Sequence, residues 1–173
     1  PTLTLNCDSL PFLCQTLHDS SVRFEDESFH QCSNLPQESN HMLHTSIDFT
    51  QPGKQQGFLQ VPYSHNLGGW ANVMIPVTTV ANGNGPTVLV LGGNHGDEYQ
   101  GQVAAMKLAR QLTPDMVTGR IILIPSLNFP AARAATRLSP LDGMNMNRAF
   151  PGEPDGCVTS QVAHFLTNVL FPL

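Results

Sequence analysis

The sequence has few basic residues and no long apolar run. Its 173 residues include eight Lys and Arg against thirteen Asp and Glu, a formal net charge of -5. Because nucleic-acid binding depends on Lys and Arg that neutralise phosphates, this balance argues against a nucleic-acid partner and favours a small molecule. No apolar run approaches the roughly 18 residues of a membrane span, and the start lacks a signal-peptide pattern. We therefore expect a cytoplasmic protein with no membrane partner.

Cysteines are also scarce, and their spacing excludes two common uses. Three of the four lie in the first third of the chain and Cys157 stands apart, which fits neither a disulfide framework nor a paired Cys-x-x-Cys zinc site. Residues 1–45 are polar and show no sustained period of 2 or 3.6, so we predict a poorly ordered extension there. Residues 46–173 can bury one core, which predicts one domain or part of a larger one.

Three stretches before residue 92 have the composition of β-strands. Residues 57–61 and 73–80 are rich in β-forming side chains, and Pro76 within the second favours an edge position, since proline lacks a ladder donor. A turn signal, Asn-Gly-Asn-Gly-Pro, precedes residues 87–91. That last stretch, Thr-Val-Leu-Val-Leu, shows no polar alternation. We expect it to be central and covered on both faces.

The rest of the chain alternates between helix and strand. Apolar residues recur with helical spacing in 99–112 and again in 158–171, and 120–125 is a second apolar strand. A strand, helix and strand in succession form a right-handed crossover, which implies a parallel pair. The predicted fold is α/β, a mixed and largely parallel sheet flanked by helices.

His95 and Glu98 follow the first of these parallel strands, on a glycine-rich turn that enters a helix. In α/β sheets ligands bind at the carboxyl ends of strands, and a spacing of three lets an imidazole and a carboxylate converge on one metal ion. The spacing alone is weak evidence. The competing interpretation is that Asp97 and Glu98 are acidic residues of a helix first turn, with His95 an ordinary loop residue.

The loop after the second parallel strand holds three of the six arginines of the chain: Arg133, Arg137 and Arg148. A guanidinium beside a metal site suits a carboxylate-bearing substrate or a developing oxyanion. For Arg133 taken singly, a solvated loop is the preferred interpretation. Asn147 and Arg148 are adjacent, so both could address one carboxylate.

Two motifs in this order resemble the succinylglutamate desuccinylase/aspartoacylase family of the zinc carboxypeptidase superfamily. They are Gly-Asn-His-Gly-Asp-Glu at 93–98 and Asn-Met-Asn-Arg-Ala-Phe-Pro-Gly at 145–152, with Thr136-Arg137 between them. The resemblance covers about residues 46–173. Within the family, residues 61–64, Trp70 and residues 73–76 are most similar to the N-acetyl-diaminobutyrate deacetylases of ectoine degradation.

The resemblance implies a zinc-carboxypeptidase-like fold and Zn²⁺ as cofactor. His95 and Glu98 would be metal ligands, and Arg137 would be catalytic, polarising the scissile carbonyl. Asn147 and Arg148 would bind the substrate carboxylate. Family members often carry Asp where this chain has Asn145, at a position that supports the metal ligands. Asp142 is the possible substitute for that supporting role.

The implied activity is hydrolysis of the amide bond of a small-molecule N-acyl amino acid. The family's third ligand, a His, and its general-base Glu are expected beyond Leu173, so we expect an inactive amino-terminal fragment of the enzyme; His164 is expected to be solvated, on a helix face shared with Gln161. The alternatives are a zinc carboxypeptidase-type peptidase and a non-catalytic carboxylate-binding protein. Assembly into a homo-oligomer stays open.

Overall fold

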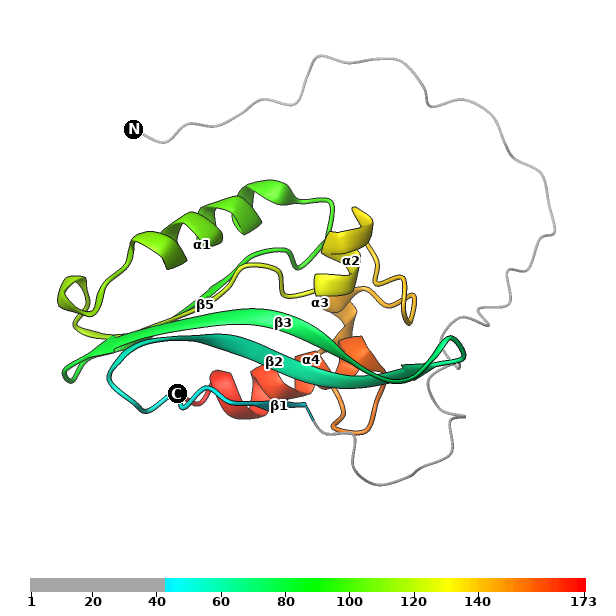
Figure 1. The fold of residues 1–173 in the computed structure, drawn as a ribbon, viewed down its shortest axis with the longest axis horizontal. Coiled ribbons are helices and arrows are strands. Elements are labelled where there is room, and N and C mark those ends of the chain that lie inside the picture. The colour runs from blue at the N-terminus through cyan, green and yellow to red at the C-terminus, as the bar shows by residue number, and fades with distance from the viewer. Residues whose placement is uncertain (1–42) are drawn as a thin grey trace, which may run out of the picture.

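A five-stranded mixed sheet forms the centre of the molecule, with helix α1 on one face and α4 on the other (Figure 1). The computed structural model describes residues 43–173 of the chain. The strands lie in the order β1-β2-β3-β5-β4, and β4 and β5 are the parallel pair. Their bounds are His44–Thr45 (β1), Gly53–His65 (β2), Gly68–Asn82 (β3), Thr87–Leu91 (β4) and Gly119–Ile124 (β5).

The helices follow the strands closely in the chain, and the predicted strand-helix-strand unit is confirmed. Helix α1 connects β4 to β5 through the short helix η2, and β4 pairs with β5 in parallel. The remaining helices follow β5, and the last of them continues into a π-helical turn, η3. The bounds are Tyr99–Gln111 (α1), Pro114–Met116 (η2), Phe129–Ala134 (α2), Met146–Ala149 (α3), Val158–Phe165 (α4) and Leu166–Leu170 (η3).

Strands β2 and β3 form a long antiparallel hairpin that extends the two predicted strands in both directions. The edge position expected from Pro76 is wrong for its strand, because β3 lies between β2 and β5. The β3–β5 ladder begins only at Thr78. Pro76 therefore lies in the half of β3 that β5 does not reach, where a missing N–H on that side costs no ladder hydrogen bond.

The prediction that residues 87–91 form a central strand is wrong for the described sheet. Strand β4 has the predicted bounds, but it pairs with β5 alone and lies at the edge of the sheet formed by residues 43–173. Val88 remains 48% exposed and Leu91 38% exposed. An apolar run indicates that a strand can be covered on both faces, but it does not specify which neighbours cover it.

The sheet separates two cores of different size. The smaller lies against α1 and includes Val80, Ala109 and Leu123. The larger lies on the opposite face, where α4 and η3 contribute Val162 and Leu166. Its other fully or nearly fully buried members include Leu59, Val61, Ile75, Val77, Ile122, Ile124, Leu127 and Met146. Burial on both faces holds β5 rigidly, and β5 leads into the second polar loop.

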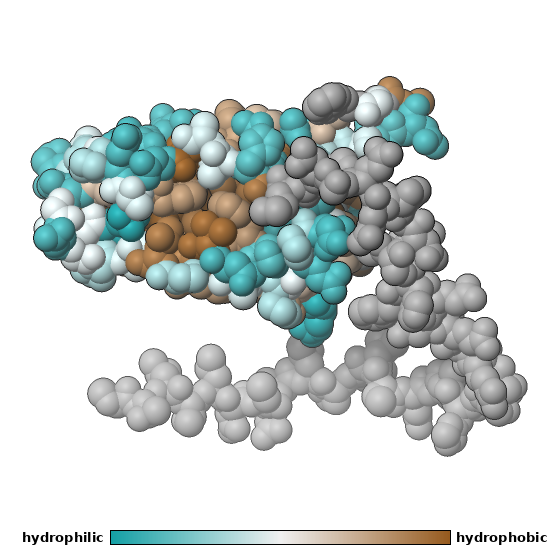
Figure 2. Space-filling view, turned by 90° about the horizontal axis from the view of Figure 1, so that it is seen from below, coloured by the Kyte–Doolittle hydropathy of each residue, from teal (hydrophilic) through white to brown (hydrophobic). Residues whose placement is uncertain are grey.

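One face of the molecule shows apolar surface at its centre, surrounded by polar side chains (Figure 2). This is the view from below Figure 1, on the side of α4 and β1. Exposed apolar residues near the carboxyl end are Val169, Phe171 and Leu173. Within residues 43–173, no helix combines the length and apolarity that crossing a bilayer requires.

The predicted extension, residues 1–45, lies outside the described residues except for its last three. Those three belong to the folded body, since Leu43 is 9% exposed and His44–Thr45 pair with β2. The prediction for residues 1–42 stays a prediction.

Candidate functional site at the carboxyl ends of β4 and β5

The two polar loops are joined directly at the ends of the parallel strands. The amide of Gly92 donates to the carbonyl of Ile124 at 2.9 Å, and Leu127 donates back to Gly92 at 2.8 Å. Asn128 donates to the carbonyl of Gly93 at 3.0 Å. Glycine is required here, because a Cβ on Gly92 would lie 2.6 Å from the carbonyl oxygen of Pro125. The two loops thus form one site.

Gly96 brings the His95 turn against helix α2. A Cβ at Gly96 would lie 2.0 Å from the carbonyl carbon of Ala131, so no side chain fits. The Gly96 amide also donates to the carbonyl of Thr136 at 2.9 Å. This contact positions the turn beside the segment that carries Arg137.

Gln102 connects the same turn to the end of β5, a role that the sequence reasoning missed. Its side-chain amide donates to the carbonyls of Gly96 at 3.1 Å and Glu98 at 3.2 Å. Its Oε1 accepts from the hydroxyl of Ser126 at 3.0 Å. Gln102 is 7% exposed. The sequence signal that could have identified it is its spacing, since it shares the apolar face of the helix with Ala105 and Ala109.

His95 and Glu98 are brought together as the spacing suggested. Imidazole Nδ1 lies 2.8 Å from Glu98 Oε1. His95 is 4% exposed, whereas the Glu98 side chain is 58% exposed and opens to solvent. Glu98 precedes the first residue of α1, but its carboxylate makes no capping hydrogen bond to that helix. Its Oε1 faces His95 instead.

The other imidazole nitrogen of His95 faces two amide side chains. Nε2 lies 3.1 Å from Asn145 Oδ1 and 3.3 Å from Asn147 Nδ2. When Nε2 carries the proton it donates to Asn145, and the Nδ1 lone pair then faces Glu98. When Nδ1 carries the proton it donates to Glu98, and Nε2 accepts from Asn147. Both tautomers thus find partners, and a cation bound at Nδ1 would leave the Nε2 proton to be donated to Asn145.

Arg137, Asn147 and Arg148 lie around this pair in different ways. Arg137 Nη1 is 3.5 Å from Glu98 Oε1, and its side chain is 55% exposed. Asn147 Oδ1 accepts from the Asn94 amide at 2.6 Å. Arg148 is exposed on α3, and its guanidinium has no hydrogen bond or ion pair within residues 43–173. Asn147 thus contacts His95 directly, while the Arg148 guanidinium is available for a ligand.

Asp142 does not take the position next to His95. Its carboxylate caps helix α4, accepting from the Thr159 amide at 2.8 Å and from the Thr159 hydroxyl at 3.0 Å. Asn145 lies beside His95 instead. It immediately precedes α3, at the end of the loop. An amide oxygen accepts the imidazole N–H as a carboxylate would, without adding a negative charge.

His164 lies apart from the site, on α4, where Nδ1 is 3.1 Å from Asn168 Nδ2. The expected solvated face is only partly exposed, since Gln161 is 6% exposed and donates to the Gly156 carbonyl at 2.8 Å. The loop before α4 folds back over this face. Among residues 43–173, no three His, Cys, Asp or Glu side chains are grouped as a metal site would require.

The fold belongs to the zinc-carboxypeptidase-like class, as predicted. It is a mixed sheet flanked by helices, with polar groups at the carboxyl ends of two parallel strands. The chain belongs to the succinylglutamate desuccinylase/aspartoacylase family, whose catalytic domain matches residues 84–172. The match includes all five predicted site residues.

Individual relatives are similar over most of the chain. The chain is 50% identical over 131 residues to the N-alpha-acetyl-L-2,4-diaminobutyric acid deacetylase of Halomonas elongata. This alignment covers 76% of the chain and 38% of that protein. The product-bound ectoine utilization protein EutE (DoeB) of Ruegeria pomeroyi superposes with a TM-score of 0.75 at 44% identity, covering 78% and 41%. A succinylglutamate desuccinylase/aspartoacylase of Rhodobacter sphaeroides gives 0.74 at 50% identity, covering 76% and 41%. The chain thus spans about two fifths of the length of these relatives.

Proposed function

We propose that this chain contributes to a zinc-dependent amidohydrolase that cleaves the amide bond of an N-acyl amino acid. The observation that carries the proposal is the 2.8 Å approach of His95 Nδ1 to Glu98 Oε1, with Asn145 behind the imidazole. The similarity to a named N-acetyl-diaminobutyrate deacetylase supports that compound as the first substrate to test.

The donor set fits part of a zinc site. One imidazole nitrogen and one carboxylate oxygen are adjacent, and both are common zinc ligands. With Nδ1 on the ion, Nε2 would carry the proton and donate to Asn145 Oδ1. A catalytic zinc ordinarily has three protein ligands. We place the third ligand and the general base in the part of the relatives' length that this chain does not span. When bound, the ion would supply Lewis acidity and lower the pKa of a water molecule.

The side chains around the pair suit a substrate that carries negative charge. Arg137 reaches Glu98 at 3.5 Å, so its guanidinium lies beside the place where the scissile carbonyl would polarise, and we assign it to the oxyanion. The exposed Arg148 guanidinium can bind a carboxylate through two parallel hydrogen bonds. We assign Asn147 to the same carboxylate, with Asn94 orienting its amide.

The experiment compares His95→Ala with His65→Ala in a protein of the relatives' length that contains this chain. His65 is exposed on the β2–β3 hairpin and serves as the matched control. We expect His95→Ala to lose bound zinc, measured by elemental analysis, and to lose acetate release from N-acetyl-diaminobutyrate. His65→Ala should retain both.

Retention of zinc and deacetylation by His95→Ala would refute the site assignment. Release of carboxy-terminal amino acids from peptides without deacetylation would favour the peptidase alternative. Carboxylate binding without hydrolysis of either substrate would favour the non-catalytic alternative.

A further inference from the structure

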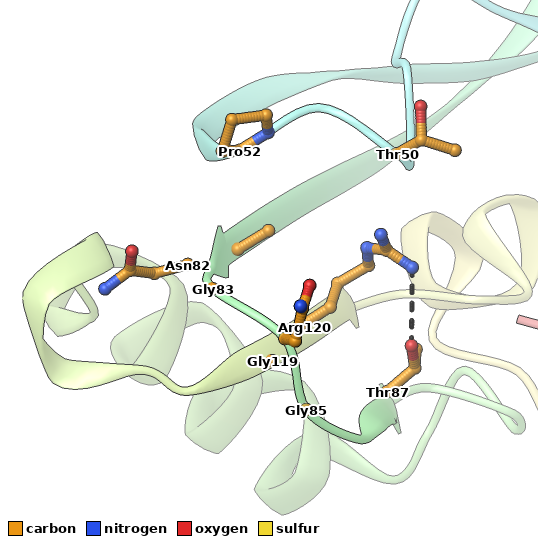
Figure 3. Close-up of a pocket in the computed structure, with 10 residues that line it drawn as sticks. Thr50, Pro52, Asn82, Gly83, Gly85, Thr87, Gly119 and Arg120 are labelled. Atoms are coloured by element: carbon orange, nitrogen blue, oxygen red, sulfur yellow. Dashed lines mark hydrogen bonds between the residues drawn. The ribbon is translucent and has the colours of Figure 1, made fainter.

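A polar hollow lies at the opposite end of the parallel strands from His95. It has a volume of about 240 Å³ and is formed by the loop before β2, the β3–β4 turn and the start of β5. Figure 3 shows Arg120 extending between Thr50 of the first loop and Thr87 at the start of β4. At roughly 30 Å³ per liquid water, the hollow has room for a small ion with several waters.

Arg120 is poorly satisfied in this position. Its Nη1 donates to the Thr87 hydroxyl at 3.3 Å, a long bond to a neutral acceptor. Its Nε is buried and has no hydrogen-bond partner within residues 43–173. No carboxylate of the described residues forms an ion pair with it. A guanidinium has five N–H donors, and one that is largely withdrawn from water without an anionic partner is energetically unfavourable.

Asp48 interacts electrostatically with Arg120, but its hydrogen bonds are to Thr50. Its Oδ1 accepts from the Thr50 amide at 2.8 Å and from the Thr50 hydroxyl at 2.6 Å. These bonds are the main reason that the pKa of Asp48 is lowered, and the charge of Arg120 is the smallest contribution. Asp48 therefore opposes an anion in the hollow only at a distance and does not neutralise Arg120.

The rest of the lining is compatible with an anion. The Thr87 hydroxyl accepts from Arg120 and keeps its own proton to donate, whereas the Thr50 hydroxyl donates to Asp48 Oδ1. At Gly83, whose φ is +64°, an added Cβ would meet nothing within 4 Å, so the turn leaves the space beside it open. The Thr87 hydroxyl and the Arg120 guanidinium thus supply donors to the hollow, with one positive charge between them.

We propose that this hollow binds a small oxyanion, a phosphate or a carboxylate, through the guanidinium of Arg120. Arginine binds both kinds of group through paired N–H donors, which the single bond to Thr87 leaves available. The site is distinct from the loops that carry His95 and Arg148, and it does not depend on the proposed hydrolysis.

The test is a titration of the ¹⁵N-labelled chain with inorganic phosphate and, separately, with acetate, followed through backbone amide shifts. A phosphate bound at the hollow should shift the amides of Gly83, Thr87 and Gly119 together and saturably. Arg120→Gln should lower the apparent affinity for phosphate, obtained from these shifts, by at least about tenfold. A hydrogen bond to a charged group contributes about a factor of ten or more in affinity. If Arg120→Gln does not fold, Arg120→Lys replaces it as the test variant. Because it keeps the charge but not the paired donors, it should retain only part of the affinity.

Arg110→Gln is the matched control, because Arg110 is exposed on α1 and the change in net charge is the same. It should leave the titration unaltered. Shifts confined to the His95 and Arg148 loops would overturn the proposal, as would equal weakening by Arg110→Gln and Arg120→Gln. A response to phosphate alone, or to acetate alone, identifies which oxyanion the hollow binds.

Discussion

Replacing Gln102 by Met should destabilise the fold and loosen the turn that carries His95. The substitution keeps the length of an unbranched side chain but removes two donors and one acceptor, at 3.1, 3.2 and 3.0 Å. At about 0.5–1.5 kcal/mol net per hydrogen bond, the three sum to about 1.5–4.5 kcal/mol. Because the Ser126 hydroxyl is buried and loses its acceptor, we expect about 2–4 kcal/mol.

The assay is urea denaturation of the chain, with Gln111→Met as the control. Gln111 is exposed at the end of the same helix, so its substitution should change the free energy of unfolding by less than about 0.5 kcal/mol. In the Gln102→Met protein, hydrogen exchange of the Gly96 amide, which donates to Thr136, should accelerate more than exchange within β5.

A loss below about 1 kcal/mol, or one equal to that of Gln111→Met, would refute this account of Gln102. A uniform acceleration of exchange across the chain would show that Gln102 acts on global stability and not on the turn.

Two further predictions concern carboxylates. Asp142→Ala should lower the free energy of unfolding by about 1–2 kcal/mol, because the amide and hydroxyl of Thr159 lose their acceptor at the start of α4. The control, Asp115→Ala on η2, should change the free energy of unfolding little. Equal urea midpoints for the two variants would contradict this prediction. Thr50→Val should raise the pKa of Asp48 toward its ordinary value, measured by NMR titration, and Thr50→Ser should not. A depressed pKa contributes stability that is present above the unfolded-state value and is lost as the pH falls through the folded-state value, so the difference between Thr50→Val and Thr50→Ser should vanish in acid. An unchanged pKa in Thr50→Val would rule out the hydroxyl as its main cause.

Local patterns predicted the elements well where periodicity and composition agreed. Strand β4 and the start of α1 lie where the sequence placed them, and β4 pairs in parallel with β5 as the crossover required. The position of β4 in the sheet could not be read from its residues. An apolar strand looks the same in the middle of a sheet and at its edge, since only its neighbours distinguish the two.

The candidate site was only partly predictable for a related reason. The interval between His95 and Glu98 limits how far apart their side chains can be, and the turn residues around them narrow the range further. The position of Asn145 against His95 depends on the path of a loop fifty residues later in the chain. The local sequence does not show which of Asn145 and Asp142 faces the imidazole. In the structure Asn145 precedes α3 beside His95, whereas Asp142 accepts from Thr159 at the start of α4.

The fold class and the strand-helix-strand unit could be read from the sequence, as could the proximity of His95 to Glu98, because these depend on periodicity and on contacts within a few residues. Three features needed the tertiary structure: Gln102 connects the two loops, Asn145 faces the imidazole, and Arg120 has no anionic partner within residues 43–173 in a hollow at the far end of the strands. Each of these depends on distances between segments that are remote in the chain, which packing establishes and local sequence does not encode.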